Sequence, residues 1–298
     1  EGPLFYDRWN DPGIYPWDTP LEERAKWDAF TAVNHWISLG YGWCYSEDHS
    51  CSWPTIVIDP RGRERTKIGL EWGKGYFLPQ TRKQLPKNLQ GVIRRKYMYA
   101  LTYPDDVKGM SGYNITYNDP DKPDDIYFYL PSMRKVKRMS EGSRQDYMSG
   151  TLFRNSDFTI VKPIHHYKIL RTELFKHPGT DVFGFREKNW VEKNIPTIHN
   201  IGEPCWVIEV TPKREPWWYA KQTWWVGMKS LTKVYELSYD KKGRLFRTHS
   251  CGYWVPHYEQ NPLFITWQNW IVEELLTGYR GIIFTGEKGF KTPWGEFE

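Results

Sequence analysis

The stretch PWWYAKQTWW, residues 216–225, concentrates four tryptophans and a tyrosine in ten positions of a chain that is otherwise polar. Side chains alternate between the two faces of a β-strand, so this stretch directs Trp217, Tyr219 and Trp225 to one face and Trp224 to the other. Tryptophan on both faces fits a strand that is buried on both sides. It equally fits a strand of a curved sheet in which one face lines an apolar cavity, and the sequence leaves open which face that is.

Segments with a period of two continue on both sides of this stretch, separated by Pro, Gly, Asp and Asn. They are TIVID, RTKIGLEW, GVIRRKYMYALTY, GYNITYND, DIYFYLP, RKVKRM, TELFKH, CWVIEVTPK, TKVYELSYD and GRLFRTH. Because turn signals separate neighbouring segments, they predict an antiparallel meander. The expected fold class is therefore mainly β (α+β), with a curved antiparallel sheet over residues 55–255.

Two further segments are predicted to be helices that pack against this sheet. In DTPLEERAKWDAFTAVNHWISLG, residues 18–40, Thr19 suits the N-cap, Pro20 suits the first helical position, and Glu22 completes a capping box. Apolar residues then recur at every fourth position. The second segment, PLFITWQNWIVEELLTGY, covers residues 262–279.

No break in composition demands a second domain, so residues 1–298 are predicted to form a single domain. Residues 1–54 are its N-terminal arm and amphipathic helix, and residues 256–298 are a C-terminal helix and tail. Aromatic residues make up 17% of the chain. A surplus of this kind often lines a cavity or a binding face.

The formal net charge of +5 is spread along the chain without a block of like charges, so no nucleic-acid partner is expected. The densest basic cluster is MRKVKRM, residues 133–139, and forms a basic patch of Arg134, Lys135, Lys137 and Arg138. Apolar residues interleave with these cations. The cluster therefore fits a solvated strand, which we prefer, or a patch that meets anionic lipid or protein.

The four cysteines are an even number, which permits full pairing and fits an exported protein. Of the three possible pairings we prefer Cys44 with Cys51, which closes a short loop, and Cys205 with Cys251, which ties two predicted strands together. In a rival interpretation, Cys44, His49 and Cys51 bind a metal. Their spacing fits no standard zinc pattern, so no metal is predicted.

The sequence contains no run of about 18 apolar residues that could form a membrane-spanning helix. It begins at Glu1 without Met, which fits a precursor whose leader has been removed. Together with the cysteines, this predicts a periplasmic or outer-membrane-associated protein.

The run DDIYFYLPSMRKVKRMSEGSRQDYMSGTLFRNSDF, residues 124–158, joins an aromatic strand, a Leu-Pro turn, a basic strand and an Asp-bearing loop. A second run joins EPCWVIEVTPK to YAKQTWWVGMKSLTKVYELSYDKKGRLFR. In their order and spacing these motifs resemble the domain-of-unknown-function 1329 family of proteobacterial envelope proteins, which are outer-membrane lipoprotein-sorting-like and related to the lipoprotein carriers LolA and LolB. The resemblance covers roughly residues 91–253. The four cysteines and the Trp-rich N-terminal segment depart from the family.

The resemblance implies a half-open barrel of antiparallel strands that wraps around helices and shelters acyl chains or other hydrophobic molecules. It also implies a transporter of the resistance-nodulation-division type as a candidate partner. We therefore predict a non-enzymatic envelope protein that binds or carries a lipid, a lipoprotein acyl chain or another hydrophobic molecule, without a cofactor. The predicted ligand-binding residues are aromatic: Trp217, Tyr219, Trp225, Tyr127, Tyr129 and Trp206.

Two other functions stay open. The chain fits a structural or accessory subunit of an envelope complex, which needs only large contact surfaces. It also fits a carbohydrate-binding protein or a glycosidase, in which Glu203 and Glu209 supply paired carboxylates and sugars stack on indole rings. The sequence lacks the motifs of dinucleotide, nucleotide, serine-hydrolase and zinc-protease sites. The pair His165 and His166 fits one buried and one exposed ring.

Overall fold

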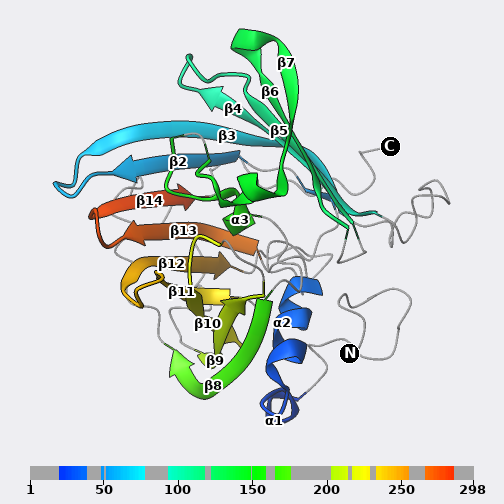
Figure 1. Cartoon of the computed structure of the whole chain (residues 1–298), viewed down its shortest axis with the longest axis vertical. Helices are drawn as coiled ribbons and strands as arrows, with labels where there is room; N and C mark the ends of the chain where they lie inside the picture. Colours follow the sequence, from blue (N-terminus) through cyan, green and yellow to red (C-terminus); the bar gives the residue numbers. More distant parts are fainter. Residues whose placement is uncertain are drawn as a thin grey trace. The chain divides into compact units, whose positions relative to one another are not determined.

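The computed structural model describes residues 20–38, 48–49, 52–77, 93–117, 122–148, 150–158, 165–175, 203–213, 217–228, 233–254 and 266–284. Their fold is mainly β, with curved antiparallel sheets and three short α-helices among these residues (Figure 1). The predicted fold class is confirmed. The chain divides into two compact units, and the prediction of a single domain stays a prediction.

Unit 1 comprises Glu1–Pro12, Ser46–Pro163 and Val272–Glu298. Its strands follow the linear order β7-β6-β5-β4-β3-β2-β14, all antiparallel, and β1 pairs with β3. The strands are β1 (Asp48–His49), β2 (Ser52–Ile58), β3 (Glu64–Phe77), β4 (Ile93–Tyr103), β5 (Ser111–Tyr117), β6 (Asp125–Leu130), β7 (Lys135–Met139) and β14 (Tyr279–Phe284). Its helices are η1 (Pro131–Met133), η2 (Glu141–Gln145) and α3 (Asn155–Phe158).

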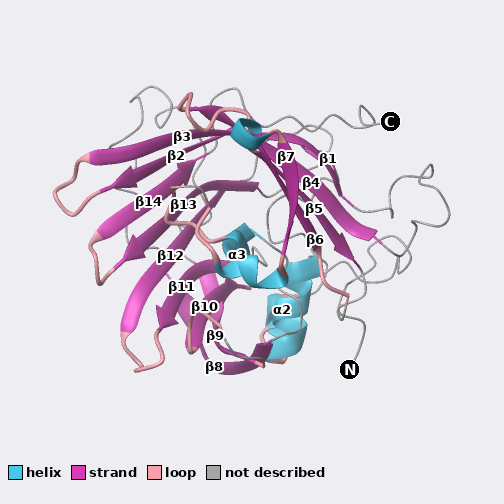
Figure 2. Ribbon diagram, turned by 45° about the horizontal axis from the view of Figure 1, so that its top comes forward, coloured by secondary structure: helices cyan, strands magenta, loops and turns pink. Residues whose placement is uncertain are grey.

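Unit 2 comprises Gly13–Tyr45 and Ile164–Ile271. Its strands follow the order β12-β11-β10-β9-β8, and α2 lies beside β8 (Figure 2). The strands are β8 (His165–Phe175), β9 (Glu203–Pro212), β10 (Lys221–Gly227), β11 (Lys233–Tyr239) and β12 (Leu245–Trp254). The helices are α1 (Leu21–Arg24) and α2 (Ala29–Ser38), and β13 (Thr266–Glu274) spans the boundary of the two units. No helix in the described ranges has the length and apolar character needed to cross a membrane.

The predicted N-terminal helix is divided into two. It begins close to the expected position, but its N-cap is Pro20 and no side chain caps it. The interruption falls at Asp28, whose carboxylate accepts a hydrogen bond from the N–H of Thr31 at 2.7 Å and so caps the start of α2. The bonds from Thr31 lower the pKa of Asp28. The apolar spacing predicts one continuous helix, but Asp28 starts a second helix and so divides the segment into α1 and α2.

The predicted C-terminal helix is wrong. Residues 262–279 contain β13, which ends at Glu274, then a turn and the start of β14. The turn is closed by the N–H of Gly278, which donates to the Glu274 carbonyl at 2.7 Å, and Gly278 has a φ of +73° that favours glycine. Short apolar runs such as LFITW and WIV carry no period that separates a buried strand from a helix. The pairing of β14 with β2 shows that the end of this segment is a strand.

The predicted disulfide between Cys205 and Cys251 is also wrong. Both are buried thiols, and Cys251 Sγ lies 3.6 Å from His249 Nε2. Cys205 belongs to β9 and Cys251 to β12, and β10 and β11 lie between these strands. Three strand spacings amount to about 14 Å, whereas a disulfide requires Cα atoms within about 7 Å. Cys44 and Cys51 lie outside the described residues.

One type of turn closes a hairpin in each unit. The sequences are DPRGR at residues 59–63 and DKKGR at residues 240–244. In both, the aspartate carboxylate accepts two backbone N–H bonds and an Nε–H bond from the last arginine, at 2.8–3.0 Å. The glycine adopts a φ of +78° or +75°. Asp59 accepts a further bond from Arg65, so its carboxylate holds the β2–β3 hairpin together.

The bonds to Asp59 predict a pH-dependent contribution to stability. The backbone bond from Arg63 is the largest cause that lowers the pKa of Asp59 from 3.8 to about 2. Because the folded pKa lies below the unfolded one, the stabilisation is complete above the unfolded pKa and is lost as pH falls from 3.8 towards about 2. Replacing Asp59→Asn should therefore lower the free energy of unfolding at neutral pH, and the difference from wild type should shrink across this window in urea titrations.

The control for this prediction is Glu64→Gln, which removes the same charge from an exposed neighbour in β3. Its effect should be small at every pH. A loss in Asp59→Asn that is equally large at neutral and strongly acidic pH would contradict the assigned role of the carboxylate.

Candidate functional site

The two faces of the unit 2 sheet carry different chemistry. Strand register places Trp206 opposite Val226 and Ile208 opposite Trp224, so these four side chains share one face. Trp225 lies opposite Val207 and belongs to the other face. We call the first the helix face and the second the aromatic face.

The helical segment of unit 2 covers part of the helix face. Trp27, between α1 and α2, stacks on Trp206 with ring centroids 5.7 Å apart and an angle of 13° between the planes. Arg24 Nη1 donates to the carbonyl of Met228 at 2.7 Å, just after β10. Trp206 is completely buried. Stacking of two indoles removes much apolar surface from water and fixes the segment on the sheet.

A buried polar network lies on the helix face around Glu236. Its carboxylate accepts bonds from Lys233 Nζ, from Gln222 Nε2 at 2.7 Å and from Ser238 Oγ at 3.0 Å. Arg247 is fully buried and its Nη1 lies 3.7 Å from the same carboxylate. The Glu236 carboxylate therefore has the hydrogen-bonded partners that a buried charge requires.

Trp224 is tied to this network, since its Nε1 donates to Gln222 Oε1 at 2.9 Å. Lys233 Nζ also lies 5.0 Å from the centre of the Trp224 ring, within the range of a cation–π contact. Trp224 is therefore a core residue that combines apolar burial with a satisfied polar group.

Residues 217–220 precede β10 and form an aromatic cluster with the start of β8. The Tyr219 hydroxyl and His165 Nε2 are hydrogen-bonded at 2.6 Å, and Trp217 meets the His165 ring edge-on at 5.5 Å. Trp218 packs edge-on against Tyr219 at 4.7 Å. His165 is buried and His166 is exposed, as their alternation predicts.

The aromatic face carries three rings in mutual contact. Phe175, Trp225 and Tyr235 have centroids 5.5–5.6 Å apart, and Phe175 and Tyr235 are only half-buried. Trp225 Nε1 donates to Glu173 Oε1 at 2.6 Å, and Arg171 Nε donates to Glu173 Oε2 at 2.6 Å. These bonds, first that of Arg171 and then that of Trp225, lower the pKa of Glu173. The indole is therefore held in one orientation by a charged acceptor.

The structure does not gather the predicted ligand-binding residues into one site. Trp217 and Tyr219 lie in the cluster around His165, Trp225 lies on the aromatic face and Trp206 on the helix face. Tyr127 and Tyr129 belong to β6 in unit 1. Phe175 and Tyr235, which complete the three rings around Trp225, were not predicted. Their contact depends on register between strands far apart in sequence.

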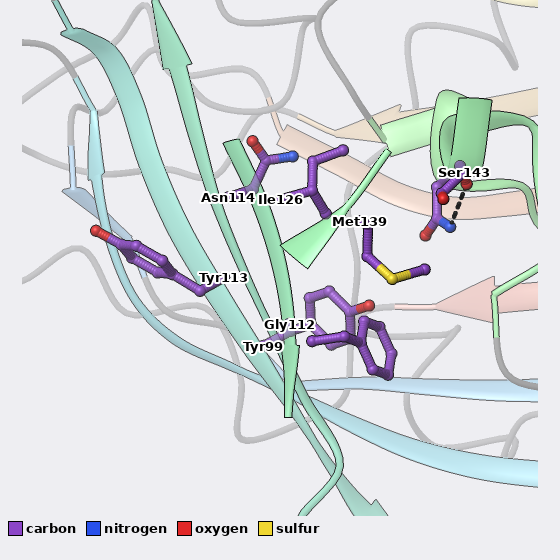
Figure 3. A pocket seen from close by; sticks show the side chains of 9 residues that line it. Tyr99, Gly112, Tyr113, Asn114, Ile126, Met139 and Ser143 are labelled. Atoms are coloured by element: carbon purple, nitrogen blue, oxygen red, sulfur yellow. Dashed lines mark hydrogen bonds between the residues drawn. The ribbon is translucent and has the colours of Figure 1, made fainter. Parts of the chain in front are cut away.

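In unit 1, alternation along β6 turns Tyr127 and Tyr129 to one face and Ile126 and Phe128 to the other. The second face lines a small cavity of about 20 Å³, room for about one water molecule (Figure 3). Ile126, Phe128, Met139, Ser143 and Asn155 line it together with Tyr99, Gly112, Tyr113 and Asn114. A Cβ at Gly112 would lie 2.4 Å from the Tyr99 ring, so glycine permits this packing.

The residues of the other predicted sites are placed as follows. The cations of the basic patch are all exposed around β7, and Arg138 forms an ion pair with Asp125. Among the described residues no three His, Cys, Asp or Glu side chains lie together as metal ligands. Of the rival metal ligands, Cys44 and Cys51 lie outside the described residues, and only the backbone of His49 is described.

The two glutamates of the glycosidase alternative occupy distant positions on one strand. Glu203 and Glu209 are six residues apart on β9, whose pairing with β10 is regular. Six residues of strand span about 20 Å. Paired glycosidase carboxylates lie about 5–9.5 Å apart. Glu209 also forms an ion pair with Lys221 at 3.3 Å.

Comparison with known proteins finds a family model, described as "Uncharacterized protein", that matches residues 94–293. A domain from Vibrio parahaemolyticus described as an outer membrane lipoprotein-sorting protein has 19% identity and a TM-score of 0.60, covering 84% of this chain and 87% of that one. A DUF1329 family protein from Desulfovibrio piger has 18% identity and a TM-score of 0.59, with the same coverage. A LolA superfamily protein from Nitrosomonas europaea has 15% identity and a TM-score of 0.48, covering 81% and 85%. No curated protein matches the chain. At these identities the first two likenesses establish the fold.

The buried network predicts that Glu→Gln substitutions at two positions of the unit 2 sheet differ greatly in their effect on the free energy of unfolding. Glu236→Gln leaves Lys233 and Arg247 buried without their carboxylate and should lower the free energy of unfolding by about 3 kcal/mol. Glu209→Gln removes a half-exposed partner of Lys221 and should cost less than about 1 kcal/mol. Urea titrations followed by circular dichroism measure both. Equal losses in the two variants would show that the network around Glu236 contributes no special stabilisation.

Proposed function

The chain belongs to the domain-of-unknown-function 1329 family, and on this premise we propose that it is a non-enzymatic protein of the cell envelope that binds or carries a hydrophobic ligand. The aromatic face of unit 2 is its proposed binding surface. The observation that carries the proposal is the group of three contacting rings, Phe175, Trp225 and Tyr235, two of which are only half-buried.

The chemistry of this face suits an apolar guest. Three rings in contact offer a broad apolar surface, and the bond from Trp225 to Glu173 orients the central indole before a ligand arrives. Burying an alkyl chain contributes about 0.8 kcal/mol of binding free energy per CH₂. Ten methylenes therefore contribute roughly 8 kcal/mol, before the entropy lost on ordering the ligand is subtracted. That corresponds to micromolar or weaker binding, which permits release.

The helix face is less suited to this role. The stacked pair of Trp27 and Trp206 already covers part of it, and its centre is occupied by the ion network around Glu236. A guest chain there would have to displace a packed indole or lie against buried charges, both of which cost free energy. We therefore place the ligand on the face of Trp225, and assign Trp206 and Trp224 to the core.

The likeness to a lipoprotein-sorting domain supports a lipid or a lipoprotein acyl chain as the ligand and the periplasm or the outer membrane as the location. A transporter of the resistance-nodulation-division type is the proposed partner that would deliver or receive it. The spacing of Glu203 and Glu209 weighs against a glycosidase. A structural subunit of an envelope complex is the function that remains if no ligand binds.

The proposal predicts that Phe175→Ser combined with Tyr235→Ser weakens binding of a dansyl-labelled fatty acid. Each lost ring contact is worth about 0.5–1.5 kcal/mol, so Kd should rise roughly tenfold or more. Energy transfer from tryptophan to the dansyl group measures Kd, and Trp225 stays in place as a donor.

The matched control is Tyr113→Ser combined with Tyr127→Ser, which removes a pair of contacting rings from unit 1. It should bind the probe as wild type does. If this control loses binding and the unit 2 variant keeps it, the ligand site lies in unit 1. If the wild type binds no probe, the carrier function fails.

A further inference from the structure

The β6–β7 hairpin of unit 1 combines dense positive charge with exposed apolar side chains. From Ile126 to Met139 the chain carries four cations and no carboxylate. Met133, in the connecting turn, is 48% exposed, and Val136, on β7, is 64% exposed. Met133 and Val136 are three positions apart, so their exposed side chains lie close to the cations of the same hairpin.

Most of the positive charge on this hairpin is available. Arg138 pairs with Asp125, which also accepts a bond from the Tyr117 hydroxyl at 2.6 Å. Arg134, Lys135 and Lys137 are exposed, and within the described part of the chain none of the three forms an ion pair. The hairpin therefore presents at least three unneutralised cations.

The backbone presents these groups in several directions around one end of the hairpin. Arg134 follows η1 in the left-handed conformation, with a φ of +47°, and its N–H donates to the Pro131 carbonyl at 3.1 Å. Along β7, Val136 lies opposite Tyr129 on one face, whereas Lys137 lies opposite Phe128 on the other. β7 is the last strand in the order of unit 1. Its residues 135–138 are exposed on both faces of the strand.

We propose that the β6–β7 hairpin docks unit 1 on a membrane surface that contains anionic lipids. Met133 and Val136 enter the headgroup region, while Arg134, Lys135 and Lys137 meet the lipid phosphates. Long basic side chains reach headgroups while their stems stay on apolar surface. The half-buried Tyr129 beside Val136 is of the type that settles at such interfaces.

Protection of an edge strand explains only part of this pattern. Lysines on an outer strand discourage another chain from adding to the sheet, which accounts for Lys135 and Lys137. It does not account for exposed Met133 and Val136, which would favour such an addition. A membrane surface uses both kinds of side chain, so it fits the hairpin better than a protein strand does.

The experiment is co-sedimentation of the full chain with vesicles of phosphatidylcholine alone and with vesicles that also contain phosphatidylglycerol. Wild type should bind the anionic vesicles much more tightly, and salt should weaken binding. Arg134→Gln, Lys135→Gln and Lys137→Gln together should reduce binding roughly a hundredfold, about fivefold per cation. Met133→Ser combined with Val136→Ser should also reduce binding, while the remaining binding keeps its dependence on salt.

The charge-matched control is Lys213→Gln, Lys241→Gln and Lys242→Gln, which removes three exposed cations from unit 2. It should bind vesicles nearly as wild type does. The proposal is overturned if this control loses as much binding as the hairpin variant, if the hairpin variants bind as wild type does, or if the wild type binds no anionic vesicles. Because fatty-acid binding is measured without vesicles, the outcome is independent of the proposed ligand.

Discussion

Unit 2 depends on a constraint that acts on two neighbouring residues: Trp224 and Trp225 are adjacent in a strand and so cannot share a face. Pairing with β9 and β11 sends Trp224 towards Ile208 and Glu236, and Trp225 towards Val207 and Tyr235. A register shift of one residue would exchange the two surroundings. The Trp225 indole, which donates to Glu173, would then lie against the ion network around Glu236. The helical segment would meet the aromatic face instead of the helix face.

The ion network makes that shift costly. Glu236 is buried and needs Lys233, Gln222 and Arg247 around it, and these residues come from three different strands. Any other register separates some of them and leaves a charge without a partner in a place that excludes water. Apolar packing alone tolerates repacking more easily. The polar cluster in the core of unit 2 therefore specifies one alignment of β10, β11 and β12.

Much of the fold could be predicted from local pattern. The alternation in TKVYELSYD and GRLFRTH, with the turn at Asp240, corresponds to β11 and β12. The helix that divides at Asp28 shows where local signals compete, because a capping aspartate interrupts a favourable apolar spacing. Residues 262–279 could not be assigned by pattern, because their short apolar runs, LFITW and WIV, have no period that distinguishes a strand from a helix.

The candidate site could be predicted only in its residue types. An excess of tryptophan and tyrosine pointed to a binding face, but strand order and register decide which rings meet. Trp206 and Trp225, predicted together, lie on opposite faces because the register puts Val207, the neighbour of Trp206, opposite Trp225. Phe175 joins Trp225 across a strand and from fifty positions away in the chain. The absence of a bridge between Cys205 and Cys251 has the same origin, since strand order is not a local property.

The pairing of β2 with β14 has a consequence for how the protein is made. Gly281 lies opposite Val57, so one edge of β2 waits for a strand synthesised more than two hundred residues later. The stack of Trp27 on Trp206 likewise joins the early segment between α1 and α2 to a late strand. Strands β8 to β12 are neighbours along the chain and can assemble as they emerge, whereas unit 1 keeps an incomplete edge until the last strand arrives. During synthesis that edge of β2 is open to pairing with other chains, because an unpaired strand edge recruits them.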